Sequence, residues 1–250
     1  MFDAQCLHEI SVVANKLKIS SAALQAIAEV ESGGRIFASF AGKREPLIRF
    51  EGHYFDRLLN GQQRQLARQQ GLAHPKAGKI RNPRSQERRW ELVNRAIKIN
   101  RIAALSSVSW GLGQVMGAHW QWLGYGSVDA LVAEARSGAA GQVRLMAQYI
   151  DRAGLIPTIQ IEDWKEFART YNGPSYARYA YDRKIEHALK RLSRQSPEPD
   201  VQNSQADRVQ IVRMGEHGAL ARLAKFVAGA KKRMERSIRA GLLLISKRIL

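Results

Sequence analysis

The sequence has one cysteine among its 250 residues and no long apolar segment. A single thiol, Cys6, excludes an intramolecular disulfide, so we expect a fold that rests on its core alone. No stretch reaches the roughly 18 apolar residues of a membrane span. The start, Met1-Phe2-Asp3, lacks a basic stretch followed by an apolar run, and we therefore expect no secretory signal peptide.

Motifs for metal binding and for several kinds of catalysis are also scarce. The six histidines are scattered, and with one cysteine they offer no zinc-binding spacing. The sequence contains no Gly-x-Ser-x-Gly element and no phosphate-binding loop. We therefore expect neither a metal nor a cofactor.

Positive charge, in contrast, is abundant. The formal net charge is +18, which predicts attraction to polyanions such as nucleic acid, anionic lipid or lipopolysaccharide. Arg88 and Arg89 beside Trp90 raise the alternative of a nucleic-acid-binding protein. Because no recognised nucleic-acid-binding fold accompanies these residues, we expect no specific nucleic-acid partner.

Apolar residues recur every three or four positions, which predicts a mostly α fold. A stripe from Cys6 to Leu17 marks a first helix, and the hydroxyls of Ser20-Ser21 begin a second one that Gly33-Gly34 ends. A short hairpin near Ala41-Gly42 is consistent with the sequence, and the polar residues 61–84 predict a loop on the surface. Further helices are predicted from Ser85, at about 127–137, 139–153 and 162–171, and from Pro174 to about 194.

The C-terminal fifth of the chain differs in composition. The segment Ser196-Pro197-Glu198-Pro199-Asp200 indicates a linker, so we divide the chain into a domain over 1–195, a linker over 196–207 and a tail over 208–250. Apolar residues from Leu220 to Ile249 recur in the tail with helical spacing, among many lysines and arginines. This predicts a basic amphipathic helix that binds an anionic envelope surface. The alternative is that its apolar face docks on the domain or pairs with another copy of the chain.

One carboxylate interrupts an apolar stripe. Leu24, Ile27 and Ala28 share a helix face, and the next position on that face is Glu31. Burial disfavours the charged form, so we expect a raised pKa for Glu31, as a general acid near neutral pH requires. The alternative is a partly exposed Glu31 that pairs with Arg35.

Three short motifs occur in a fixed order. Glu31-Ser32 ends a helix, Gly111-Leu112-Gly113-Gln114 forms a turn, and Tyr171-Asn172-Gly173 follows. Together they resemble the signatures of goose-type lysozymes and soluble lytic transglycosylases. The block Pro46–Phe55 is more similar to the phage-type N-acetylmuramidases, and that resemblance covers about residues 5–195.

The resemblance implies a lysozyme-like helical domain that cleaves peptidoglycan between N-acetylmuramic acid and N-acetylglucosamine, with Glu31 as the acid. It also implies that a further set of residues contacts the glycan strand: Gln114, Tyr171, Asn172, Gly111, Leu112 and His53. For Tyr171 the competing role is packing, and for Asn172 it is ending a helix. The phage relatives imply an endolysin that accumulates in the host cytoplasm and reaches the wall through the periplasm after release by a separate partner.

A hydrolase also needs a base or a positioned water. Glu51 is the leading candidate for the base, because Phe50, Tyr54 and Phe55 can shield it. The alternative is a salt bridge to Arg49 or Arg57. If no second carboxylate faces Glu31, a lytic transglycosylase that forms anhydro products becomes the competing reaction; a wall-binding protein without turnover is a third interpretation.

Overall fold

The structure is a computed structural model that describes residues 2–174 and 176–195. The predicted linker and the predicted basic tail lie outside these described residues. No described helix is long and apolar enough to cross a membrane.

The first two helices begin and end where the sequence predicts. Helix α1 spans Ala4–Leu17, and its N-cap Asp3 accepts a hydrogen bond from the backbone of Cys6. Helix α2 spans Ser21–Ser32 and is capped by the hydroxyl of Ser20. It ends at Gly33, whose φ of +63° is a left-handed conformation that glycine adopts without strain.

The strands are short and form two small sheets. The hairpin predicted near Ala41-Gly42 is confirmed: β1 (Phe37–Phe40) pairs with β2 (Lys43–Pro46) in antiparallel register. A second sheet has the order β3-β4-β5, which the sequence did not predict; its strands are β3 Ile48–Phe50, β4 Val108–Trp110 and β5 Val115–Met116.

The bounds of the other helices are α3 Gly52–Leu58, α4 Gly61–Gln69, α5 Gln86–Ile99, α6 Arg101–Ser106, α7 Val128–Arg136, α8 Ala139–Arg152, α9 Ile156–Gln160, α10 Trp164–Asn172 and α11 Tyr181–Gln195, with 3-10 turns η1 Gly117–His119 and η2 Tyr176–Tyr179. The helices predicted from Ser85 and at about 127–137, 139–153 and 162–171 are confirmed, whereas α3, α4, α6 and α9 were not predicted.

Two predictions about these segments are wrong. Residues 61–84 are not all surface loop, because α4 fills their first part and Leu72 and Ala73 behind it are buried. The last helix begins at Tyr181 instead of Pro174. A left-handed Gly173, the turn η2 and a left-handed Ala180 come before it, so the chain bends twice ahead of α11.

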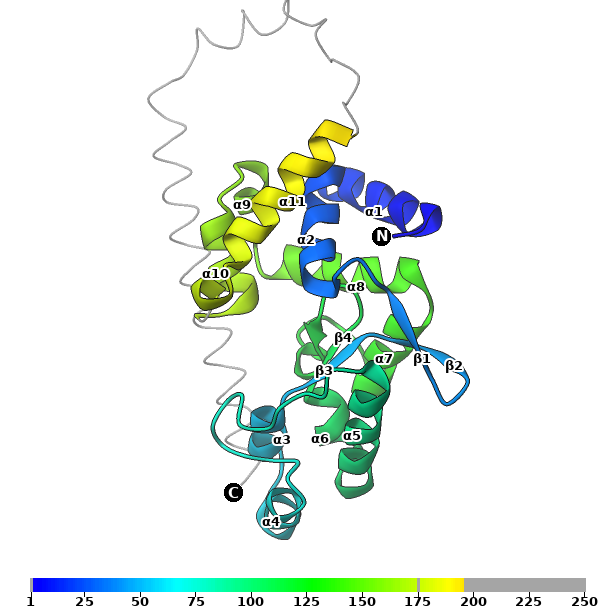
Figure 1. The fold of residues 1–250 in the computed structure, drawn as a ribbon, viewed down its shortest axis with the longest axis vertical. Coiled ribbons are helices and arrows are strands. Elements are labelled where there is room, and N and C mark those ends of the chain that lie inside the picture. The colour runs from blue at the N-terminus through cyan, green and yellow to red at the C-terminus, as the bar shows by residue number, and fades with distance from the viewer. Residues whose placement is uncertain (1, 175, 196–250) are drawn as a thin grey trace, which may run out of the picture. The chain divides into compact units, whose positions relative to one another are not determined.

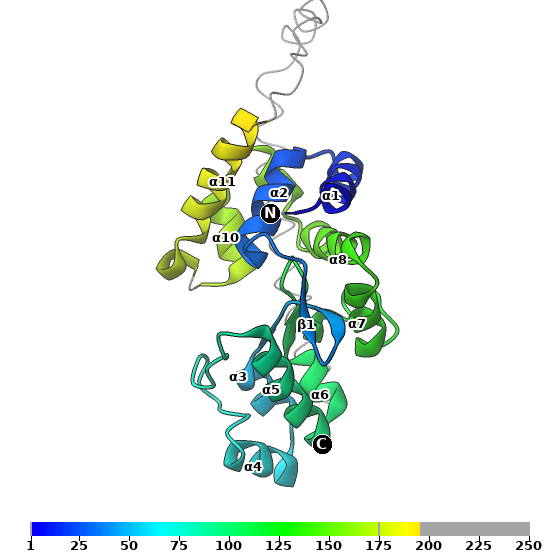
Figure 2. The same ribbon diagram turned by 45° about the vertical axis from the view of Figure 1, so that its right-hand side comes forward.

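The unit formed by the chain up to Leu192 has two hydrophobic cores. Helices α1, α2, α10 and α11 surround the first core, together with most of α8. Helices α3 to α7 and the β3-β4-β5 sheet surround the second. Figure 1 and Figure 2 show the first set of helices at one end of this unit and α3 to α6 at the other.

One buried polar side chain joins elements of both cores. The amide of Gln142 on α8 is 1% exposed and makes three hydrogen bonds to backbone groups. Its Oε1 accepts from the N–H of Leu112 at 2.8 Å, and its Nε2 donates to the carbonyls of Ile36 and Ala135. The segment after α2, the turn after β4 and the end of α7 therefore share one fixed point.

Candidate active site

Glu31 lies in the last turn of α2, on the face that packs into the first core. Leu24, Ile27 and Ala28 on that face are fully buried, while the Glu31 residue itself is partly exposed. Burial raises the pKa of Glu31 from 4.5 to about 7, against the smaller lowering effects of Asn172 and Arg49. The expected raised pKa is confirmed, so this carboxyl can both hold and release a proton near neutral pH.

Asn172, the last residue of α10, is the direct partner of Glu31. Its Nδ2 donates a hydrogen bond of 2.6 Å to Oε1 of Glu31. The ion pair with Arg35 considered from the sequence is not the contact that forms. The Oδ1 of Asn172 is buried and accepts no hydrogen bond from any described residue. The amide therefore orients the carboxyl and leaves one acceptor for another group.

Tyr171 is held by the protein on both its ring and its hydroxyl. The hydroxyl donates to the carbonyl of Gly113 at 2.6 Å. The ring stacks on Phe167 with centroids 5.2 Å apart and meets Tyr149 edge-on at 5.0 Å. Packing is therefore an observed role of Tyr171, and its hydroxyl fixes the turn after β4 beside Glu31's partner Asn172.

The turn Gly111–Gln114 packs against α8. Leu112 is 0% exposed in the first core, so its side chain cannot contact a glycan. Gly111 has a φ of +67°, and a Cβ there would lie 2.8 Å from the Gln142 amide oxygen. Gly113 meets Met146 equally closely. The glycines allow helix α8 to approach, as in a tight turn over the core, and glycan contact by Gly111 stays a prediction.

Gln114 ends this turn in a left-handed conformation, with a φ of +47°. Its side-chain Nε2 donates to the carbonyl of Gly111 at 2.7 Å. The amide nitrogen is therefore used within the turn, and the residue remains partly exposed. A glycan contact by Gln114 stays a prediction that would involve its amide oxygen.

Glu51 lies at the start of α3, where its N–H bonds the carbonyl of Ser107 at 2.8 Å. Its Oε1 accepts from Nε of Arg49 at 2.8 Å. Its Oε2 lies 3.4 Å from Nδ1 of His53, without the geometry of a hydrogen bond. Of the two salt bridges considered, that with Arg49 forms, whereas the Arg57 guanidinium lies over the ring of Tyr54.

His53 lies against this carboxylate and the ring of Tyr54. Burial lowers the pKa of His53, against the opposing attraction of Glu51. The imidazole is therefore neutral at pH 7, and its Nδ1 has no hydrogen-bond partner among the described residues. A neutral ring with a free nitrogen can bind a hydroxyl or an amide, so contact with the glycan remains open.

Two tyrosines outside the sequence motifs, Tyr149 and Tyr181, also belong to the surroundings of Glu31. Tyr149 has its pKa raised to about 12 by burial, with smaller effects from Tyr54 and Glu31. Burial also raises the pKa of Tyr181, where Glu31 and Glu51 both contribute. Both tyrosines therefore lie within electrostatic reach of Glu31. No local pattern identifies them, because they come from α8 and the start of α11.

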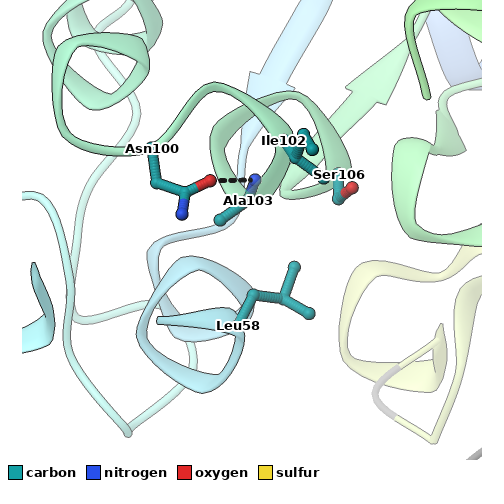
Figure 3. Close-up of a pocket in the computed structure, with 5 residues that line it drawn as sticks. All are labelled: Leu58, Asn100, Ile102, Ala103 and Ser106. Carbon is teal, nitrogen blue, oxygen red and sulfur yellow. Dashed lines mark hydrogen bonds between the residues drawn. The ribbon is translucent and has the colours of Figure 1, made fainter. Parts of the chain in front are cut away.

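Two further features of the described residues bear on binding. No group of three or more His, Cys, Asp or Glu side chains in this part of the chain could hold a metal ion. A shallow cavity of about 240 Å³ lies between α3 and α6 and contains none of the site residues named above (Figure 3). It is lined by Leu58, Asn100, Ile102, Ala103 and Ser106, and Asn100 there caps α6.

A mostly helical unit with a protonatable glutamate at a helix end, beside a small sheet and several tyrosines, defines the lysozyme-like class of glycoside hydrolases. Comparison with known proteins agrees. Residues 20–193 match the family described as Muramidase, N-acetylmuramidase, and the chain belongs to this family. It is therefore a peptidoglycan hydrolase.

A solved structure supports the same conclusion. The crystal structure of the Burkholderia AP3 phage endolysin has 30% sequence identity to the chain and a TM-score of 0.64. The match covers 75% of this chain and 71% of the endolysin chain. No curated protein matches the sequence.

Proposed function

We propose that the protein is a phage-type endolysin that hydrolyses the β-1,4 bond between N-acetylmuramic acid and N-acetylglucosamine, with Glu31 as general acid. The supporting observation is the environment of Glu31: a carboxyl at the edge of an apolar core, with a pKa raised to about 7 and an amide that orients it. An acid of this pKa can hold and release a proton near neutral pH.

The proposed reaction uses two carboxyl groups in different states. Protonated Glu31 gives its proton to the glycosidic oxygen while the bond from that oxygen to C1 of muramic acid breaks. A water molecule adds to C1, and its proton passes to Glu51, which the ion pair with Arg49 holds in place. This division of roles is that of an inverting glycosidase. The products are a muramic acid reducing end and a free 4-hydroxyl on N-acetylglucosamine.

The competing reaction is that of a lytic transglycosylase. There Glu31 first donates its proton and then accepts one from the 6-hydroxyl of the same muramic acid, which attacks C1 and forms an anhydro ring. This route needs no second carboxylate. Glu51, which follows β3 and pairs with Arg49, supports the hydrolytic route, because it acts electrostatically on the same Tyr181 as Glu31 and can serve as the acceptor for a proton of water.

Mass spectrometry of soluble products from purified peptidoglycan tests the proposal. We expect reducing-end muramic acid from the wild type. We expect release to be about a thousandfold slower with Glu31→Gln, since Gln keeps the shape but has no proton to donate. Glu51→Gln should lower the rate about a hundredfold. Glu29→Gln, which removes a partly exposed carboxylate of α2 that pairs with Arg191, is the control and should be active.

The outcomes separate the alternatives. Anhydro-muropeptides from the wild type would assign the transglycosylase reaction. Wild-type rates from Glu31→Gln would remove Glu31 from the mechanism. No glycan release from the wild type would contradict the whole proposal and leave a wall-binding role.

The tail over 208–250 carries a separate proposal about delivery. We propose that it binds an anionic membrane or lipopolysaccharide surface after the protein leaves the host cytoplasm with the help of a permeabilising partner. Its sequence combines apolar helical spacing with many basic residues. Deleting 208–250 should reduce binding to vesicles of anionic lipid while residues 1–207 still cleave purified wall. Equal vesicle binding by the shortened chain would contradict the membrane role.

A further inference from the structure

Arg49 is a basic residue whose charge acts on Glu31. Strand β3 alternates, so that Ile48 and Phe50 are fully buried in the second core while Arg49 points to the other face. In the β3-β4 register Arg49 pairs with Ser109, just before the Gly111 turn. Arg49 also lowers the pKa of Glu31, which places its charge beside the acid.

Only part of the Arg49 guanidinium is used by the protein. Its Nε donates to Glu51, and its side chain is 52% exposed. The two terminal nitrogens bond to no carboxylate of the described residues. A guanidinium has a planar fork of donors that matches a carboxylate, so this free edge is suited to an anionic group of a ligand.

A second exposed arginine comes from the segment that pairs with the residue before β3. Arg35 follows the glycines that end α2, four positions after Glu31. The next residue, Ile36, accepts a hydrogen bond from Leu47 at 3.4 Å, which fixes this segment beside β3. Figure 1 shows the chain running from the end of α2 directly into β1. Arg35 is exposed and pairs with no carboxylate among the described residues.

A third arginine adds positive charge beneath the other two. Arg89 from α5 donates to the carbonyls of Pro83 and Ile48, at 2.8 and 3.1 Å. Burial lowers the pKa of Arg89, and the charges of Arg49 and Arg35 lower it further. Arg35 and Arg49 therefore both lie within electrostatic reach of Arg89, which is itself bonded to β3, and Glu51 is the one carboxylate of the described residues bonded to any of the three.

We propose that Arg35 and Arg49 form an anion site that binds a carboxylate of the peptidoglycan beside the bond that is cleaved. The inference rests on the proposed function, since that substrate has carboxylates close to its glycosidic bonds. They occur on the peptide stems, and on the lactyl group of muramic acid where the stem has been removed. Arg89 holds β3 in place and adds charge. The site thus selects charged, muramic-acid-containing strands over neutral ones.

The test compares cleavage of native wall with cleavage of the same wall after its free carboxylates have been converted to amides. The variant is Arg35→Gln, because Arg35, unlike Arg49, does not pair with Glu51. Lys16→Gln is the control, since it removes the same charge from an exposed position on α1. Reducing ends are measured at limiting substrate and at physiological salt, where general attraction is screened.

We expect the wild type to prefer the native wall. Arg35→Gln should reduce the ratio of native to amidated rates about fivefold, as expected for one exposed ion pair. Arg35→Lys should recover most of the ratio, and Lys16→Gln should keep it unchanged. Equal losses in Arg35→Gln and Lys16→Gln would overturn the inference, since both would then reflect net charge alone.

A third substrate separates the two sources of the carboxylate. Strands stripped of peptide by an amidase retain only lactyl carboxylates. If Arg35→Gln slows the release of reducing ends from these strands, the bound carboxylate is that of the lactyl group. If the slowing is confined to native wall, the bound carboxylate belongs to the peptide stem. If the wild type releases no reducing ends from any of these walls, the proposed function fails as well. With an active wild type, an unchanged ratio in Arg35→Gln contradicts the anion site alone.

Discussion

Glu31 and Glu51 have the same side chain but lie in opposite surroundings. Glu31 extends an apolar face of α2, and its hydrogen-bond partner is the neutral amide of Asn172. Glu51 begins α3, and its partner is the charged guanidinium of Arg49. The first environment favours the acid form of Glu31, whereas the second places a cation beside the carboxyl of Glu51. In the proposed mechanism the neighbours of two identical side chains give them different roles.

Stability measurements should separate these two surroundings most clearly. The pKa of Glu31 rises from 4.5 to about 7 on folding, so the folded protein binds more protons between these values. The free energy of unfolding therefore falls as the pH rises from about 4.5 to 7. Glu31→Gln has no such penalty. The difference in free energy of unfolding between this variant and the wild type should therefore change by about 3 kcal/mol in favour of the variant when the pH rises from 4 to 8.

Glu51→Gln provides the opposite arm of that experiment. It removes the partner of an exposed arginine and should destabilise the protein by about 0.5 kcal/mol at pH 8. Urea unfolding at both pH values measures both effects. A Glu31→Gln variant whose advantage is the same at pH 4 and pH 8 would contradict the raised pKa.

A smaller effect is expected when the partner of Glu31 is removed. Asn172→Ala deletes the amide that orients the carboxyl and lowers its pKa. We expect the maximal rate to fall about tenfold, as for one lost hydrogen bond to a reacting group. Wild-type activity should decline above about pH 7, and the variant's decline should move to higher pH. A rate loss with an unmoved pH profile would limit Asn172 to a structural role.

The parts of the site that depend on neighbouring residues could be predicted from the sequence. The apolar face that ends in Glu31 is a property of one helix, and so is the cap at Ser20. The pairing of Glu51 with Arg49 lies within three residues. The bond between Glu31 and Asn172 joins positions 141 residues apart, and only the family resemblance brought both into view.

The errors came from contacts that the sequence pattern does not contain. Helix α4 has a polar sequence, yet Ala67 packs into the second core and Arg68 makes a bidentate pair with the buried Asp56, at 2.6 and 2.8 Å. Leu112 belongs to a motif associated with glycan contact, but the approach of α8 buries it completely. In both places tertiary packing overrides the structure expected from the local sequence pattern.

The amide of Gln142 has a consequence for motion. It bonds the backbone of Leu112 and of Ile36, so the turn beside Asn172 and the segment with Arg35 cannot open without breaking a buried contact of α8. We therefore expect the amide hydrogen of Leu112 to exchange slowly with solvent, because its exposure requires this buried hydrogen bond to break. Opening at the turn is thus coupled to loosening of helix α8.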